Sequence, residues 1–207
     1  MSDARAAILG RLRAGQRTGR LPAAADVHVP APRAVSADET LARFLTELSA
    51  LGVDTHVETT ADCVRARVAV LVGGSRVFSW DPEWLPYEAG SVLSSPIRGA
   101  DARDLQAAAA IGVTGCDGAI AETGSLVLLP GEGRPRAASL LPPVHLAIVR
   151  RGDLRFSMGE YLRERGGAIA TASGCVVVTG PSRTADIELT LTLGVHGPGK
   201  VIVVVGP

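Results

Sequence analysis

Residues 201–205 restrict the fold more than any other stretch, because all five side chains of this run are branched and apolar. A strand that is apolar on both faces must be covered on both faces, which is typical of a parallel sheet. Residues 175–179, with three consecutive valines, predict a second buried strand of this kind. Helical segments separate several of the strands. The chain is therefore expected to be an α/β protein with an open, mostly parallel sheet flanked by helices on both sides.

Shorter patterns predict the remaining elements. The clearest helix spans residues 36–51, because Ser36 and Glu39 form an S-x-x-E capping box and Gly52 fits the position after a helix. Residues 61–72 fit a helix or a buried strand, and we favour the helix. Further helices are expected at residues 2–15, 101–110, 157–165 (ended by Gly166-Gly167) and 184–189. Further strands are expected at residues 55–57, 76–80, 117–121, 125–129, 144–149 and 200–205.

The N-terminal part differs in composition from the rest. Residues 1–35 are expected to form a helix followed by a linker, because Pro22, Pro30 and Pro32 punctuate an alanine-rich stretch. Such a linker buries little surface, so it is expected to run over the domain or to reach a partner. Residues 36–207 are expected to form one α/β domain, since the chain is long enough for one sizeable core and short for two.

Composition excludes several classes of function. Lys+Arg and Asp+Glu both count 21 and aromatic residues make up 3%, so neither a basic surface nor base stacking for nucleic acid is expected. No uncharged apolar stretch approaches the roughly 18 residues of a membrane span. Cys63, Cys116 and Cys175 are odd in number and far apart, which favours buried structural thiols over a metal site or a disulfide. A cytoplasmic protein without metal or cofactor is expected.

Three polar segments are expected at the carboxyl ends of strands, where open α/β sheets bind their ligands. In the first, Glu122, Thr123, Gly124 and Ser125 lie between two apolar strand halves. A poorly solvated Glu122 would serve as acid, base or nucleophile. Alternatively, Glu122 bonds backbone amides at a bulge marked by Gly124. The residues leave both readings open.

The second segment follows the strand at residues 175–179. A Gly-Pro turn leads into an expected helix that Ser182 or Thr184 caps, and a helix N-terminus beside an arginine favours anions. Alternatively, Ser182 is only a cap and Arg183 pairs with Asp186 or Glu188. The candidate ligand-binding residues of this segment are Gly180, Pro181, Ser182, Arg183, Thr184 and Asp186.

The third segment contains His196 between glycine turns. Residues 194–200 formally fit GxxxxGK, but Val201 replaces the required Ser or Thr and a strand follows, so a P-loop is excluded. His196 is either a ligand-binding residue or a surface turn residue. His145, at the head of a strand, is interpreted as a satisfied core residue.

Taken together, these three segments resemble the LUD domain family, and within it the lactate-utilisation protein C group. The most specific part is residues 180–188 followed by His196-Gly197-Pro198, and the likeness covers residues 36–207. The resemblance implies a fold similar to the ribose-phosphate isomerase and CoA-transferase superfamily (NagB/RpiA/CoA-transferase-like). It also implies a place in the oxidation of L-lactate to pyruvate, beside an iron–sulfur protein and a second partner.

Two functions therefore stay open. The first is a component of a lactate-utilisation system that acts with an iron–sulfur partner and binds a small anionic ligand. The second is a stand-alone small-molecule enzyme of the isomerase and CoA-transferase type with Glu122 as acid/base or nucleophile. We favour the first, because it requires less of the individual residues.

Overall fold

A computed structural model describes residues 2–18, 34–184 and 192–207. Within these ranges the α-helices are α1 (Ser2–Thr18), α2 (Ala37–Ala50), α3 (Ala61–Val72), α4 (Arg103–Ala107) and α5 (Met158–Thr171). The 3-10 helices are η1 (Pro82–Trp84), η2 (Pro86–Val92), η3 (Arg136–Ser139) and η4 (Arg151–Asp153). The strands are β1 (Asp54–Val57), β2 (Val77–Ser79), β3 (Ile111–Gly115), β4 (Gly118–Ile120), β5 (Ser125–Leu128), β6 (Val144–Arg150), β7 (Leu154–Arg155), β8 (Val176–Val178), β9 (Arg183–Thr184), β10 (Thr192–Leu193) and β11 (Lys200–Gly206).

The chain divides into two compact units, residues 1–31 and residues 32–207. In the first unit, α1 confirms the helix expected at its start, and its Ile8 and Leu12 side chains are exposed. Residues 19–33, which hold most of the expected linker, lie outside the described residues. The domain boundary at residues 35 and 36 stays a prediction. The second unit holds both main sheets.

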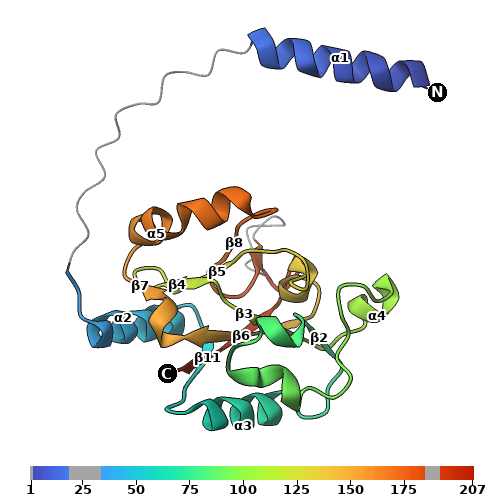
Figure 1. Cartoon of the computed structure of the whole chain (residues 1–207). Coiled ribbons are helices and arrows are strands. Elements are labelled where there is room, and N and C mark those ends of the chain that lie inside the picture. The colour runs from blue at the N-terminus through green and yellow to red at the C-terminus, as the bar shows by residue number, and fades with distance from the viewer. Residues whose placement is uncertain (1, 19–33, 185–191) are drawn as a thin grey trace. The chain divides into compact units, whose positions relative to one another are not determined.

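The central sheet is entirely parallel and confirms the predicted fold class. Its strand order is β1-β11-β6-β3-β2, and β11 pairs along its whole length with β6 (Figure 1). The side chains of residues 201–205 are all buried, as the apolar run predicted. The NagB/RpiA-like relationship of the fold stays a prediction.

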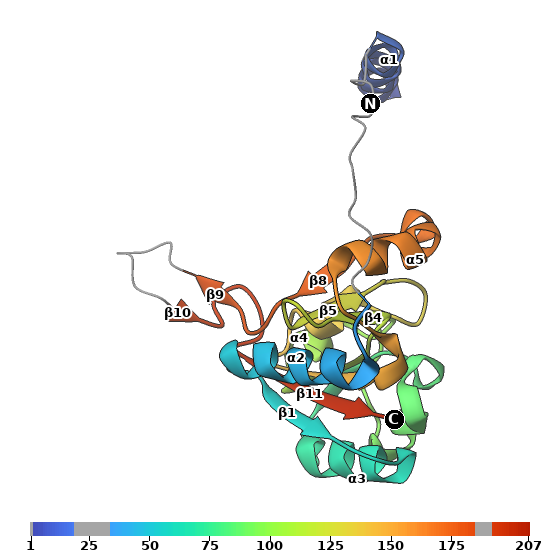
Figure 2. The ribbon, with the colours of Figure 1, turned by 90° about the vertical axis from the view of Figure 1, so that its left-hand side faces the viewer.

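A second sheet, with strand order β7-β4-β5-β8, lies over the first. Strands β4 and β5 form an antiparallel hairpin, and β8 pairs antiparallel with β5. Figures 1 and 2 show this sheet between α5 and the parallel sheet, with α3 on the far side of the parallel sheet. Helix α2 contacts β1 and β7 and so joins an edge strand of each sheet.

The β4–β5 hairpin contributes alternate side chains to two cores. Ala119 and Leu126 belong to the main core with the parallel sheet, whereas Ile120 and Val127 pack with Tyr161 of α5. Successive residues of a strand point to opposite faces, so a hairpin between two layers must be apolar on both. This explains why residues 117–129 read as two apolar strand halves.

Glycines permit the layers around β3 and β4 to approach closely. A Cβ atom at Gly112 would lie 1.8 Å from the Ala138 carbonyl oxygen of η3, and one at Gly118 would lie 2.3 Å from the Tyr161 ring. Strand β3 was not expected from the sequence, because its two glycines weaken the strand pattern. Its five residues are nonetheless fully buried.

The starts of α2 and α3 agree with the prediction. Ser36 Oγ accepts the Glu39 amide at 3.1 Å, which confirms the N-terminus of α2. Helix α3 confirms the choice of a helix for residues 61–72, and Thr60 caps it by accepting the Cys63 amide. Helix α4 is shorter than expected, with five residues.

Two expected elements are present, but the end of the helix at residues 157–165 and the burial of the strand at residues 175–179 were predicted wrongly. Helix α5 continues through Gly166-Gly167 to Thr171, because two glycines cost only about 1 kcal/mol each while Tyr161 and Ile169 pack the helix on the second sheet. Strand β8 is not buried on both faces: it is an edge strand of the second sheet, and Val177 is 44% exposed. Branched apolar residues favour a strand without deciding its burial.

We predict that Gly112→Ala lowers the free energy of unfolding by about 1–3 kcal/mol or more, which is the usual cost of overpacking a core. The added methyl group would overlap the η3 backbone, which cannot rotate away as a side chain can. Urea unfolding of both proteins measures the difference. Gly152→Ala is the matched control, since nothing lies within 4 Å of its Cβ position. Equal losses for the two variants would contradict the close-packing explanation.

Candidate functional site

The three polar segments do not share the carboxyl edge of the parallel sheet, so that expectation is wrong. His196 lies before β11 and therefore at the amino end of this strand. Glu122 follows β4 and Gly180 follows β8, and both strands belong to the second sheet. The sequence did not reveal that two sheets were present, so all strands were assigned to one edge.

The first two segments nevertheless meet through side-chain hydroxyl groups. Ser125 Oγ lies 2.7 Å from Thr123 Oγ1 and 2.8 Å from Thr179 Oγ1. Thr179 is the residue immediately before Gly180. Ser125 is buried, whereas Thr123 and Thr179 are exposed. A continuous chain of hydroxyl groups therefore links the first segment to the second.

Leu51, at the C-terminus of α2, is the second meeting point. Gly124 (φ 64°) and Gly180 (φ 79°) both approach it, and a Cβ atom at either would lie 3.1 Å from Leu51 side-chain atoms. Arg183 Nη2 donates to the Leu51 carbonyl oxygen at 2.8 Å. Because the last carbonyl groups of a helix carry partial negative charge, this contact suits a guanidinium group.

The third segment joins through Ser182. Its amide donates to the Pro198 carbonyl at 2.9 Å, and its carbonyl accepts the Gly194 amide at 3.0 Å. His196 is exposed and lines a hollow of about 340 Å³. The other residues of this hollow are Leu140, Leu141, Pro143, Gly194, Val195 and Gly197.

Residues 140–143 were missed as site residues. The sequence marked them only as the lead-in to a strand, although two exposed leucines beside prolines were an available signal. Parallel pairing of β6 with β11 brings the residues before each strand to the same end of the sheet.

Glu122 has a structural partner. Its Oε1 accepts the Met158 amide, the first of α5, at 3.0 Å, and its own amide donates to the Phe156 carbonyl at 2.9 Å. A carboxylate at a helix N-terminus is stabilised by the unpaired amides there. Glu122 thus bonds a backbone amide, as the structural alternative predicted, but that amide belongs to α5 and not to a bulge at Gly124.

The expected helix start after Gly180-Pro181 is wrong where the structure describes it. Arg183 and Thr184 form β9, which pairs antiparallel with β10. Asp186 and Glu188, the proposed partners of Arg183, lie outside the described residues. Arg183 itself is exposed.

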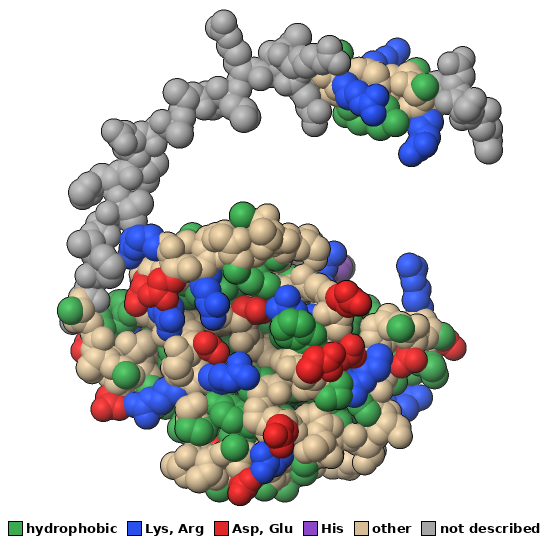
Figure 3. All heavy atoms as spheres, in the orientation of Figure 1, with side chains coloured by type: hydrophobic (Ala, Val, Ile, Leu, Met, Phe, Trp, Pro, Cys, Tyr) green, Lys and Arg blue, Asp and Glu red, His purple; other side chains and the backbone are tan. Residues whose placement is uncertain are grey.

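The cysteines only partly follow the expectation of buried thiols. Cys116 is buried, and burial raises the pKa of its thiol, whereas Cys63 and Cys175 are exposed. Across residues 2–18, 34–184 and 192–207, no group of three or more His, Cys, Asp and Glu side chains is placed to hold a metal ion. Figure 3 shows acidic and basic side chains interspersed on one face, in keeping with a net charge of zero.

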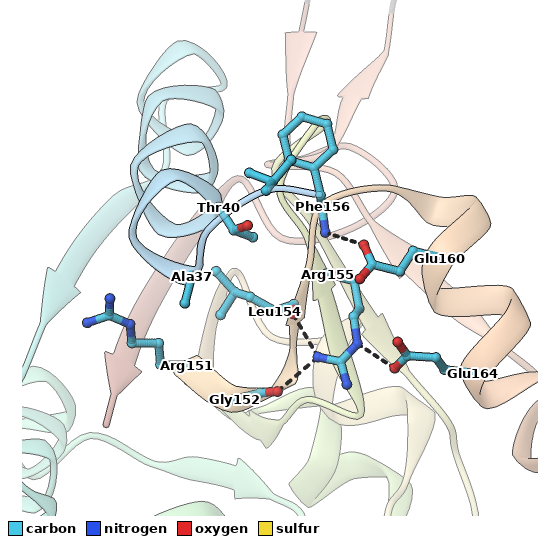
Figure 4. A pocket seen from close by; sticks show the side chains of 10 residues that line it. Ala37, Thr40, Arg151, Gly152, Leu154, Arg155, Phe156, Glu160 and Glu164 are labelled. Carbon is cyan, nitrogen blue, oxygen red and sulfur yellow. Dashed lines mark hydrogen bonds and ion pairs between the residues drawn. The ribbon is translucent and has the colours of Figure 1, made fainter. Parts of the chain in front are cut away.

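Another hollow, of about 330 Å³, lies between the first turns of α2 and α5 (Figure 4). Three of its four charged side chains are ion-paired: Arg155 Nε bonds Glu164 Oε2 at 2.6 Å, and Arg155 Nη1 also bonds the Gly152 carbonyl at 2.9 Å. Arg151 pairs with Asp38. Since these groups already satisfy one another, this hollow is a weaker ligand site than the one beside His196.

His145 is buried in β6, and its Nε2 lies 2.9 Å from Thr114 Oγ1. Its Nδ1 has no hydrogen-bond partner among the described residues, so the interpretation as a fully satisfied core residue is only half right. Desolvation by burial lowers the pKa of His145 from 6.5 to about 4. The imidazole is therefore neutral near pH 7.

We predict that Glu122→Gln lowers the free energy of unfolding by about 1 kcal/mol and Glu122→Ala by up to about 2 kcal/mol. Gln keeps an acceptor for the Met158 amide but loses the charge, whereas Ala loses both. Urea unfolding measures each value, with Glu83→Gln on the exposed surface as the control. Losses no larger than that of the control would contradict a stabilising role for Glu122.

We predict that His145 lowers the stability of the fold as the pH falls from 6.5 to about 4. In this window the unfolded chain binds a proton that the buried imidazole excludes, which removes roughly 3 kcal/mol in total. The measurement is the unfolding free energy of wild type and His145→Gln at several pH values. The difference between them should shrink as the pH falls, and a constant difference would contradict the prediction.

The described residues contain no helix with the length and apolar character of a membrane span.

The LUD domain family model matches residues 34–205. Lactate utilization protein C of Halalkalibacterium halodurans is 41% identical over 101 residues, which cover 46% of this chain and 43% of that protein. Lactate utilization protein C of Geobacillus sp. (strain WCH70) is 31% identical over 170 residues, which cover 72% of this chain and 70% of that protein. The chain thus spans less than half the length of the Halalkalibacterium relative it matches.

A solved structure also matches: a DUF162 family protein from Deinococcus radiodurans is 23% identical, with a TM-score of 0.66. The match covers 84% of this chain and all of that one, and at this identity it supports the fold alone. The resemblance drawn from the three polar segments is confirmed by the family model: the chain belongs to the LUD domain family.

Proposed function

We propose that this chain is a cytoplasmic component of an L-lactate utilisation system, in which lactate is oxidised to pyruvate. It acts with an iron–sulfur partner and binds a small anionic ligand near Arg183 and His196. The observation that carries this proposal is the match to proteins named lactate utilization protein C along 72% of the chain. The iron–sulfur partner follows from the family resemblance.

Arg183 supports the anion site. Its guanidinium is exposed, and Nη2 donates to the Leu51 carbonyl, the one hydrogen bond that it makes within the described residues. A guanidinium carries five N–H donors, so most remain for a carboxylate. Ser182 and the loop of His196 are bound to each other beside it, which places two further polar groups within the same cluster.

The stand-alone enzyme is the weaker alternative. It requires Glu122 as acid/base or nucleophile, yet one oxygen of this carboxylate already holds the α5 N-terminus. A group that stabilises a helix by its negative charge loses that role when it takes up a proton. Glu122 as a catalytic residue therefore stays a prediction.

We expect the tagged chain to retain a co-expressed iron–sulfur protein through purification. The candidate partner is the iron–sulfur protein encoded beside this chain, and the readout is the iron and acid-labile sulfide that elute with the tag. The tag alone is the control. Separate elution of the two proteins at micromolar concentration would contradict the assembly.

We expect L-lactate or pyruvate to raise the melting temperature, because a ligand that binds only the folded state stabilises it. Arg183→Gln should abolish the increase, since the carboxylate loses its cationic partner. Arg103→Gln is the matched control, because Arg103 is exposed on α4, away from the cluster. An equal increase in wild type and Arg183→Gln would remove Arg183 from the site.

A further inference from the structure

The carboxyl end of β2 carries a cavity that neither the sequence motifs nor the proposed function uses. Its volume is about 410 Å³, within the range of small-molecule sites. Asp81, two residues beyond β2, forms part of the wall, at the edge where parallel sheets bind ligands. The lining residues are Asp81, Arg98, Gly99, Ala100, Gly131, Glu132, Gly133 and Pro135.

One wall, residues 98–101, is held by a buried glutamine. Gln106 Nε2 contacts three carbonyl oxygens, those of Arg98, Gly99 and Asp101, at 3.3, 3.1 and 2.8 Å. The Arg98 amide in turn donates to Asp101 Oδ2 at 2.7 Å. This wall is therefore fixed before any ligand arrives, which lowers the entropic cost of binding.

The opposite wall, residues 131–135, is held by Arg134. Its Nη1 bonds Asp117 Oδ1 at 2.9 Å, and its guanidinium lies 4.3 Å from the centroid of the Trp84 ring. The Asp81 amide donates to the Gly133 carbonyl at 2.8 Å and so joins this wall to β2. Gly133 packs so tightly that a Cβ atom there would lie 2.8 Å from Trp84 Nε1.

Two charged groups in the cavity keep hydrogen-bonding capacity. Among the described residues neither oxygen of Asp81 accepts a hydrogen bond, and its nearest cation is Arg98 Nε at 3.8 Å. Arg98 Nη1 donates to Ser79 Oγ at 2.7 Å and to the Trp80 carbonyl, which anchors the guanidinium. Its Nη2 has no such bond in the described part of the chain. Asp81 and Arg98 thus form an ion pair that is too long for a hydrogen bond, and each keeps hydrogen-bonding capacity for a ligand.

The charge of the lining indicates the class of ligand. Asp81 and Glu132 are acidic and Arg98 is basic, so the lining carries one net negative charge, which disfavours an anion. A hydroxyl group both donates and accepts, so two adjacent hydroxyl groups satisfy an Asp–Arg pair at this separation. Carboxylates at the ends of parallel strands bind the hydroxyl groups of ribose in this way.

We propose that this cavity binds a neutral sugar or polyol through adjacent hydroxyl groups, one donating to Asp81 and its neighbour accepting from Arg98. The site is separate from the cluster of Arg183 and His196. It extends the proposed function and does not depend on it.

The test is calorimetric titration of the full chain with D-ribose, D-glucose and myo-inositol, with 2-deoxy-D-ribose to remove one hydroxyl of the pair. We expect saturable binding of at least one compound with adjacent hydroxyl groups. Asp81→Asn should weaken that binding at least about tenfold, since it removes a charged hydrogen-bond acceptor. Glu83→Gln, outside the cavity, and Arg183→Gln should bind as wild type does.

Three results would overturn the proposal: no saturable binding of any of the three compounds, equal binding by Asp81→Asn, or deoxyribose binding as tightly as ribose where ribose is the ligand. The Asp81–Arg98 pair is partly exposed, so Asp81→Asn is expected to fold with an unchanged urea midpoint. If it does not, Ala100→Leu fills the cavity from an exposed position and must abolish binding.

Discussion

Close approach of neighbouring elements to glycines in β3 and β4 is the constraint on which the layered structure depends. Gly112 lies under the η3 carbonyl of Ala138, Gly115 lies under the carbonyl of Trp84, and Gly118 lies against the ring of Tyr161. Three different elements therefore reach the same stretch of chain, each at a residue without a side chain. Larger residues there would separate η3, the segment after β2 and α5 from the sheets they cover.

This packing also explains what the sequence predicted and what it did not. Helices α2 and α3 were predicted because their signals are local: Ser36 with Glu39, and Val64 with Val68 at helical spacing. The parallel sheet was predicted because residues 201–205 are apolar on both faces of the strand, and both faces are buried. Strand β3 was missed because Gly112 and Gly115 interrupt its β-branched residues, and because the neighbours that bury it are distant in the sequence.

For the candidate site too, local features could be predicted from the sequence and long-range ones could not. The polar segments were located by composition alone, and they do cluster, through Ser125 with Thr179 and through Ser182 with Pro198. Their position at the carboxyl edge was predicted wrongly, because the pattern cannot reveal that β4, β5 and β8 form a sheet of their own. Glu122 and Arg183 bond backbone groups at the ends of α5 and α2, and a pattern of side chains in the sequence cannot predict such partners.

The two-sided β4–β5 hairpin has a consequence for how the protein can vary. Ala119 and Leu126 face the parallel sheet, while Ile120 and Val127 face α5. Inserting or deleting one residue between Ala121 and Ser125 would shift the register by one and exchange the two faces. The strand that shifts would then turn toward α5 the side chains that now face the parallel sheet, and toward the parallel sheet those that now face α5. Two cores at once thus disfavour a one-residue insertion or deletion in the turn that carries Glu122, whereas substitutions there can change its chemistry without shifting the register.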